Sequence, residues 1–266
     1  METSARANAF VGFLTLYQKE CMRFLKVIKQ TVLSPLISTS LYLLIFGVNL
    51  ADRITNQNGV NYLQFIIPGL VAMGALNNAF QNSSSSIIIS KFHGDLQDLK
   101  VVPLQAFQIL WAYALGALTR GFMVGAAITV VAQVFYLIQY GVLLKIAHIS
   151  LLLVFAILGC LNFAFLGLGI AVFAKNFDQI SAIGTFVILP LIYLGGVFFS
   201  MERMHPFWKA ISYCNPLLYL INGIRYAFLG VSDIHPLTAF GTSLGFVFIT
   251  YYLGAYAVKK GTYTRF

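Results

Sequence analysis

The sequence predicts an all-α integral membrane protein, and three observations carry that prediction. Of its 266 residues, 59% are hydrophobic and only 9% are charged, whereas a soluble domain carries about 25% charged residues. Long apolar stretches recur along the chain, and about 20 apolar residues suffice for one helix to cross a bilayer. Charged and polar segments separate these stretches. This composition excludes a soluble enzyme, a disordered protein and a disulfide-stapled secreted domain.

The first element is predicted to be an amphipathic helix over 10–28. Residues before it are polar, and no short apolar core ends in a cleavage site of small residues, so no cleavable signal is expected. Apolar side chains that include Phe13, Tyr17 and Phe24 recur at helical spacing, and Lys19 and Arg23 lie opposite them. A basic polar face of this kind favours a helix at the membrane–water interface. The alternative is a surface helix packed on a core.

Six membrane-spanning helices are predicted after this helix. Arg120 interrupts the third apolar stretch, and we expect its long side chain to reach the inner interface. Pro190 and the pair Gly195–Gly196 predict a kink in the fifth span. The predicted spans cover residues 30–50, 62–82, a stretch within 105–138, 149–173, 180–199 and 236–257.

The distribution of basic residues orients the chain. If the N-terminus is cytoplasmic, eleven Lys and Arg residues lie on the cytoplasmic side and five lie outside, with Arg120 uncounted. Basic residues gather on the cytoplasmic side of membrane proteins, so both termini are predicted to be cytoplasmic. The net charge of +9 is therefore interpreted as a topology signal and not as a nucleic-acid surface.

Residues 200–230 are predicted to form a re-entrant helical hairpin on the outer side, between the fifth and sixth spans. Two helical patterns occur there, each too short or too polar to cross a membrane. The first pattern begins near Pro206, and the second begins at Asn215–Pro216, a pair favoured as N-cap and first helical residue. The alternative is an amphipathic loop on the membrane surface, since a re-entrant hairpin must pack against protein or lie at the interface. The side chains singled out in this hairpin are Phe207, Trp208, Asn215, Pro216 and Arg225.

Motif searches exclude several chemistries. The chain has no phosphate-binding GxxxxGK[ST] loop, no GxGxxG, no HExxH and no GxSxG. Its four histidines are scattered through predicted loops and its three cysteines form no CxxC, so no metal site is predicted. The absence of Asp or Glu from the predicted spans argues against a proton- or sodium-coupled carrier. Six polar residues near membrane depth are expected to bond neighbouring helices or, alternatively, to line a substrate path: Asn77, Asn78, Gln81, Asn82, Gln133 and Asn162.

Three segments resemble the type-2 permeases of ATP-binding-cassette exporters. The most specific is PLIYLGGVFFSMERMHPFWKAISYCNPLLYLINGIRYAFLG, from Pro190 to Gly230, in which a span ending in GGVFF precedes NPL and an Arg-containing helix. The loop SKFHGDLQDLKVVPL, from Ser90 to Leu104, resembles the cytoplasmic coupling segment of that family. The run ALGALTRG, from Ala114 to Gly121, resembles its third span.

The resemblance implies a single transmembrane permease domain over 1–266, with a cytoplasmic coupling helix at 87–101 that contacts a separate ATPase subunit. Within it, Phe92, Leu96 and Leu99 share one helix face, while the charged side chains keep the segment in water. The alternative is that this face packs against the chain's own spans. The expected coupling residues are Lys91, Phe92, His93, Gly94, Asp95, Leu96, Asp98, Leu99 and Lys100.

The resemblance also implies a function. Two permease copies would move a lipidic, glycolipid or amphipathic substrate outward, driven by ATP and Mg bound by the partner ATPase, so the chain itself holds no cofactor and is not an enzyme. We expect a homodimer in the inner membrane of a bacterium, in contact with lipids and not with nucleic acid; pairing with a different permease is the alternative. Competing functions are a secondary transporter or channel, and a membrane enzyme or assembly factor. Whether Asn77, Asn78, Gln81 or Arg120 line the path stays open at this point.

Overall fold

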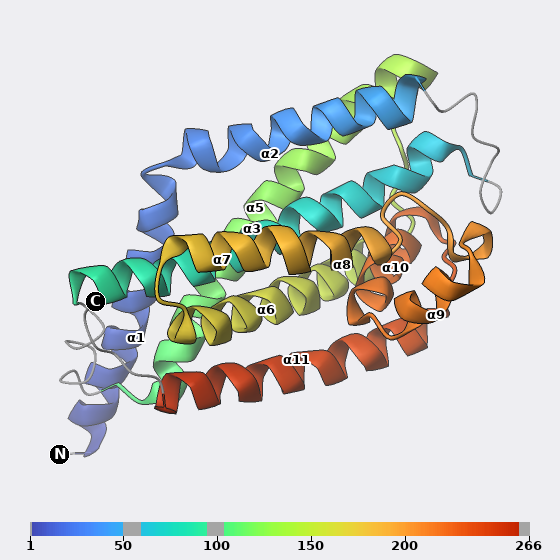
Figure 1. Cartoon of the computed structure of the whole chain (residues 1–266). Helices are drawn as coiled ribbons and strands as arrows, with labels where there is room; N and C mark the ends of the chain where they lie inside the picture. Colours follow the sequence, from blue (N-terminus) through green and yellow to red (C-terminus); the bar gives the residue numbers. More distant parts are fainter. Residues whose placement is uncertain (1, 50–59, 95–103, 261–266) are drawn as a thin grey trace.

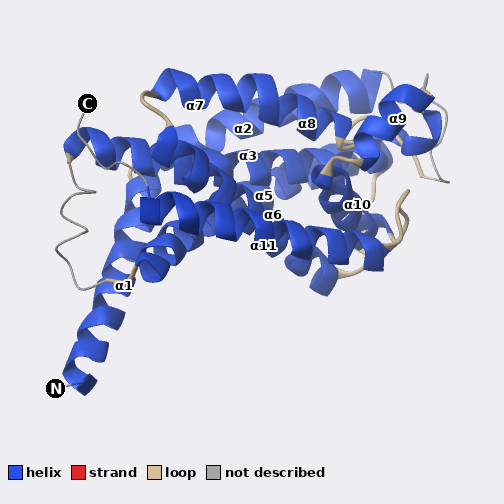
Figure 2. Cartoon of the chain, turned by 60° about the horizontal axis from the view of Figure 1, so that its bottom comes forward, coloured by secondary structure: helices blue, strands red, loops and turns tan. Residues whose placement is uncertain are grey.

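The computed structural model describes residues 2–49, 60–94 and 104–260. The regular elements in these ranges are all helices (Figure 2), which confirms the predicted all-α fold class. They are α1 (Glu2–Leu25), α2 (Ile28–Tyr42), η1 (Leu43–Asn49), α3 (Tyr62–His93), α5 (Ala106–Tyr140), α6 (Ile149–Phe173), α7 (Phe177–Ile183), η3 (Gly184–Ile188), α8 (Leu189–Leu194), η4 (Met201–Arg203), α9 (Pro206–Tyr213), α10 (Pro216–Leu229) and α11 (Pro236–Lys260).

Six helical segments in the described ranges are long and apolar enough to cross a membrane, which confirms the predicted number of spans. They are α2 with η1, α3, α5, α6, the α7–η3–α8 segment and α11. The fifth span is irregular: the π-helix η3 ends two residues before Pro190, and α8 ends with Gly195 as its C-cap. Gly196 follows with a φ of +85°, a conformation that glycine adopts without a steric penalty. The kink itself stays a prediction.

The central helix of the bundle is α3, and 78% of its most apolar stretch is buried within the chain. It packs against α5, α6 and α10. A Cβ placed on Gly121 would lie 2.9 Å from the Ala75 carbonyl oxygen, and one on Gly167 would lie 2.7 Å from that of Phe80. These glycines therefore let α5 and α6 approach α3 closely, as small residues do at helix interfaces in lipid.

The two ends of the bundle differ in the segments that they bear (Figure 1). α1 runs across one end, transverse to the spanning helices, as both Figure 1 and Figure 2 show. The end of α3, the α6–α7 turn and the end of α11 lie at this same end, whereas α9, α10 and the α5–α6 loop lie at the opposite one. Lys91, Lys175 and Lys259 thus group with α1, and Lys145 lies at the other end, as the charge distribution predicted.

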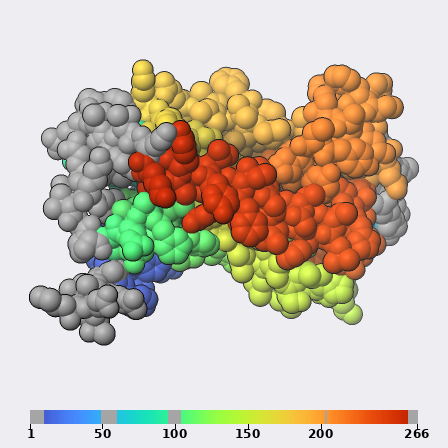
Figure 3. Space-filling view, turned by 90° about the horizontal axis from the view of Figure 1, so that it is seen from below, coloured from blue at the N-terminus to red at the C-terminus, as the bar shows by residue number. Residues whose placement is uncertain are grey.

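The segment between the fifth and sixth spans contains the short helix η4 and two α-helices, α9 and α10. α9 begins at Pro206 and α10 at Pro216, so both predicted helix starts are confirmed. The Asn215 side chain accepts a hydrogen bond from the Leu217 amide at 3.1 Å, which is the predicted N-cap. α11 crosses one face of the molecule, from α9 and α10 toward the start of α5 (Figure 3). Re-entry of this hairpin into the bilayer stays a prediction.

The predicted helix at 87–101 has a wrong N-terminal boundary. Ile87–His93 are the last turns of α3, which ends at Gly94 with a φ of 84°. The polar serine run before it does not end the helix, because its hydroxyls bond to carbonyls of the preceding turn. Ser84 Oγ, for example, donates to the Phe80 carbonyl oxygen at 2.7 Å. Bonds of this kind let a helix accommodate serine in its interior.

Candidate functional site

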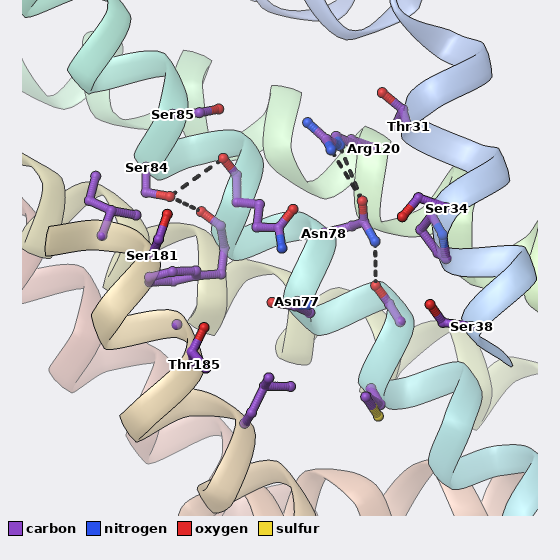
Figure 4. A pocket seen from close by; sticks show the side chains of 18 of the residues that line it. Thr31, Ser34, Ser38, Asn77, Asn78, Ser84, Ser85, Arg120, Ser181 and Thr185 are labelled. Atoms are coloured by element: carbon purple, nitrogen blue, oxygen red, sulfur yellow. Dashed lines mark hydrogen bonds between the residues drawn. The ribbon is translucent and has the colours of Figure 1, made fainter. Parts of the chain in front are cut away.

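A cavity of about 850 Å³ lies between α2, α3, α5 and the α7–η3–α8 segment. Hydroxyl side chains line its two side walls and point toward one another across the space in Figure 4. On one wall, α2 contributes Thr31, Ser34 and Ser38. On the facing wall, α7 contributes Ser181 and η3 contributes Thr185. A hydrogen-bonding interior is therefore built into helices whose composition is otherwise apolar.

α3 and α5 form the third wall of the cavity, which carries its charge. Arg120 Nε and Nη2 each lie 3.3 Å from Asn78 Oδ1. Asn78 Nδ2 donates to the Gly74 carbonyl oxygen at 3.0 Å, which turns the amide oxygen toward the guanidinium. Arg120 is thus held at the wall of the cavity by an amide acceptor, and the expectation that its side chain reaches the inner interface stays a prediction. Asn77 and Gln81 lie on the same wall.

An aromatic cluster bounds the end of the cavity nearest the hairpin. The hydroxyl oxygens of Tyr42 and Tyr193, which both line the cavity, lie 3.3 Å apart and join α2 to α8. Phe198 packs on this pair, with ring centroids 5.6 Å from each of the two tyrosines, and on Phe46 at 5.2 Å. The cluster therefore stands between the polar lining and the segment that carries α9 and α10.

A polar network ties α1 to the same wall of α3. Arg23 Nη2 donates to the backbone and side-chain oxygens of Asn82, both at 2.9 Å, and Nη1 donates to Ser85 Oγ at 3.3 Å. Glu20 is 1% exposed; it pairs with Arg23 at 3.4 Å and accepts a hydrogen bond from Ser86 at 2.6 Å. The predicted placement of Arg23 opposite the packed face of the helix is wrong, because a buried carboxylate requires a cation beside it.

The other side chains singled out in α1 divide between protein and surface. Phe24 is 2% exposed, and Phe13 packs against the core. The Tyr17 hydroxyl lies 3.0 Å from Thr119 Oγ1 of α5, and Lys19 is exposed. Part of the predicted apolar face is thus packed on α5, as in the alternative that the sequence left open. The interfacial position of α1 stays a prediction.

Lys91 takes a different place from the one expected of a coupling residue. It is 3% exposed, and its Nζ donates to the carbonyl oxygens of Val172 and Ala174 at the end of α6. A lysine in this position satisfies terminal helix carbonyls and complements the helix dipole. The expectation that it keeps the segment in water is therefore corrected.

The remaining described residues of the expected coupling segment lie at the end of α3. Phe92 is 47% exposed and stacks on Phe177, with ring centroids 5.7 Å apart and planes 2° from parallel. His93 Nδ1 lies 2.9 Å from the Ile89 carbonyl oxygen, and Gly94 is the C-cap. The expected residues that fall outside the described ranges are Asp95, Leu96, Asp98, Leu99 and Lys100.

Arg225 anchors α10 in the protein interior. The side chain is 1% exposed, its guanidinium carbon lies 3.8 Å from the centroid of the Phe65 ring, and it donates to the Gly196 carbonyl oxygen. Burial lowers the pKa of Arg225 to about 10, while the Asp233 carboxylate raises that pKa, so the guanidinium stays charged at neutral pH. α10 is thereby tied to the loop that ends the fifth span.

The other hairpin residues separate into surface and core. Phe207 and Trp208 are 61% and 49% exposed and pack edge to face at 5.2 Å. Asn215 is buried, and its Nδ2 donates to the Leu191 carbonyl oxygen at 2.6 Å, while Pro216 is the first residue of α10. The aromatic pair therefore forms an exposed patch on α9, and Asn215 fastens the start of α10 to α8.

Three of the polar residues identified at membrane depth lie away from the cavity and join helices or loops. Asn82 binds Arg23, and Gln133 bonds both backbone groups of Leu144. Asn162 donates to the Ser243 carbonyl oxygen and accepts from Thr250. The sequence reasoning missed the hydroxyls of α2 and of the fifth span. Their spacing of three or four residues, as in Thr31, Ser34 and Ser38, is the signal that would have placed them on one helix face.

Four of the six candidate spans surround a polar, cation-bearing cavity, an arrangement that suits a membrane transport protein. Comparison with known proteins specifies the class. The family model of the ABC-2 type transporter matches residues 11–229. The chain is 35% identical over 254 residues to the inner membrane transport permease YadH of Escherichia coli strain K12, covering 95% of this chain and 96% of that protein. It is 24% identical over 248 residues to nodulation protein J of Neorhizobium galegae, covering 92% and 90%.

The chain therefore belongs to the ABC-2 type transporter family, and it is a transport permease. This confirms the resemblance that the sequence segments carried. Membership in the family implies an ATPase as the partner of this membrane component.

Proposed function

We propose that this chain is the transmembrane permease of an exporter, and that it moves a lipidic, glycolipid or amphipathic substrate outward across a bacterial inner membrane. The observation that carries the proposal is the cavity of about 850 Å³ between α2, α3, α5 and the fifth span. The hydroxyls and amides of the cavity suit the polar headgroup of such a substrate, and the apolar side chains beside them suit its acyl chain. The name of the relative YadH supports the inner membrane as the location.

ATP and Mg are proposed to bind to a separate ATPase subunit, so that the chain itself holds no cofactor. Two connections support the transfer of its motion to the cavity. α3 is one continuous helix from the cavity-lining Asn78 to Phe92, which is exposed at its end. α1 is bonded to the same helix through Arg23 and Asn82. An ATPase that displaces either element therefore acts on the cavity wall, which is how a nucleotide biases a two-state permease.

A second copy of the permease is proposed to complete the path. The cavity lies between α2 and the α7–η3–α8 segment. Within the single chain, only 22% of the most apolar stretch of the α2–η1 span is buried, and only 17% of that of the fifth span. A two-fold axis that runs beside these two spans would place the cavities of the two copies opposite each other. Closed dimers are built around such an axis. The permease domain is proposed to comprise the whole chain, with α1 at the inner interface and α9–α10 as the outer hairpin.

The test is to reconstitute the chain in liposomes with an ATPase encoded beside its gene. We expect the two proteins to copurify with two permeases in each complex, to hydrolyse ATP only together, and to move a short-chain fluorescent phospholipid outward when ATP is present. The matched control is the same complex with the phosphate-loop lysine of the ATPase replaced. Uptake or release driven by an ion gradient with the chain alone would refute the proposal.

A further inference from the structure

We propose that the cavity selects amphiphiles whose headgroup carries an anionic group, and that Arg120 binds this group. The inference deepens the proposed function and rests on it, because it takes the cavity to be the place where the substrate binds. It names a substrate class, an anionic amphiphile with a phosphate or carboxylate, and a residue that recognises it.

The charge of the cavity wall is the first reason. Of the described residues that line the cavity, Arg120 is the one cation, and no carboxylate is among them. The buried carboxylate of Glu20 is engaged elsewhere, by Arg23 and Ser86. A cation at membrane depth is costly and is generally paired or functional. Arg120 faces an amide, so its charge is solvated by a dipole and not neutralised by a carboxylate.

The geometry of the guanidinium is the second reason. The group has five N–H donors in a planar fork, and the Asn78 oxygen engages those on Nε and Nη2. The donors on Nη1 make no hydrogen bond to the described residues, and the side chain is half-buried at the wall of the cavity. A planar fork with donors to spare matches the paired oxygens of a phosphate or carboxylate.

The rest of the lining suits the polar and apolar parts of such an amphiphile. Ser34 and Ser181 bring exposed hydroxyl groups to the cavity, where they can hydrogen-bond to a polar headgroup. Leu70, Met73 and Leu189 line the same cavity and provide an apolar surface for an acyl chain. The lining thus combines one cation, hydroxyl groups and an apolar surface.

The experiment measures binding of soluble short-chain lipids to the permease–ATPase complex in a non-ionic detergent that carries no phosphate. The probes are dioctanoyl phosphatidylglycerol, dioctanoylglycerol, which has the same acyl chains and no anionic group, dodecanoate and inorganic phosphate. The variants are Arg120→Gln, which removes the cation, and Asn78→Asp, which places a carboxylate where an amide now lies 3.3 Å from the guanidinium. Lys145→Gln removes an exposed cation in the α5–α6 loop and is the matched control.

We expect the unaltered complex to bind dioctanoyl phosphatidylglycerol roughly tenfold to a hundredfold more tightly than dioctanoylglycerol, as for a charge-assisted hydrogen bond. Both cavity variants should lose this preference, and Lys145→Gln should keep it. Binding of dodecanoate would show that the site accepts a carboxylate as well as a phosphate. Tight binding of inorganic phosphate would show a site for free anions and would overturn the amphiphile proposal. Equal binding of the two lipids, or a preference that survives in Asn78→Asp, would also overturn it, even if Arg120→Gln does not fold.

Failure of this inference can be told apart from failure of the proposed function. If ATP-driven lipid movement is intact but the preference for the anionic lipid is absent, only the role of Arg120 is refuted. If the chain forms no complex with the ATPase and moves no lipid, the proposed function itself is refuted.

Discussion

Replacing Arg225 by methionine is expected to lower the free energy of unfolding by about 3–5 kcal/mol. The guanidinium lies 3.8 Å over the Phe65 ring and donates to the carbonyl oxygen of buried Gly196. Leaving that carbonyl without its donor costs about 1–3 kcal/mol, and the loss of a desolvated cation–π contact costs about 2 kcal/mol. The substitution also removes the cost of keeping the guanidinium away from water, but this gain is offset because the Asp233 carboxylate loses its cation. Removing one partner from a buried charge network lowers the free energy of unfolding by about 3–5 kcal/mol.

The assay is unfolding in mixed micelles of a mild detergent and dodecyl sulfate, followed by tryptophan fluorescence. The chain has two tryptophans, and a Trp208→Phe background leaves Trp111, which packs edge to face on Phe165 at 5.4 Å and reports on the core. Lys145→Met removes an exposed cation and is the control. If the free energy of unfolding of Arg225→Met were less than about 1 kcal/mol lower than that of this control, the guanidinium would not hold α10 against the end of the fifth span.

Two further predictions concern the orientation and the coupling segment. A membrane-impermeant thiol reagent applied to intact cells should label Cys214, which is exposed at the end of the bundle that bears α9 and α10, and should spare Cys21 on α1; preferential labelling of Cys21 would reverse the orientation. Phe92→Ala should weaken binding of the ATPase by about 1–3 kcal/mol, as for an interface anchor, because the ring is 47% exposed at the end of α3. Unchanged ATPase binding and unchanged hydrolysis by the complex would place the docking surface elsewhere.

The number and position of the spans could be predicted because each is an apolar stretch of roughly 20 residues or more. The starts of α9 and α10 could be predicted because Pro206 and Pro216 are favoured as first helical residues. The length of α3 could not, because hydropathy treats its serine run as a polar segment. Bonds such as that from Ser84 to the Phe80 carbonyl remove much of that polarity from the surface of the helix.

The cavity could be predicted only in part. Asn78 and Arg120 are conspicuous because an amide and a cation are costly in a span. The single hydroxyls of Ser34 and Ser181 cost little free energy in a span, so neither is conspicuous in the sequence. The two residues are 147 positions apart (181 minus 34), and they face one another only because α2 and α7 pack around α3. Sequence periodicity identifies the face of one helix, but it contains no information on which face of another helix lies opposite.

The polar residues of α3 serve three different neighbours, and this division explains how one helix can connect the proposed ATPase contact to the proposed binding site. Asn82 faces α1 through Arg23, Lys91 faces the end of α6, and Asn78 faces Arg120 in the cavity. α3 is one continuous helix from Asn78 to Phe92, with no proline or glycine between them. We therefore expect a displacement of Phe92 by a docked ATPase to break the Lys91 contacts with α6 or to carry α6 along, and to move Asn78 relative to α5. The contact between Asn78 and Arg120, the residue that we propose to bind the substrate, is then altered by the same motion that ATP drives.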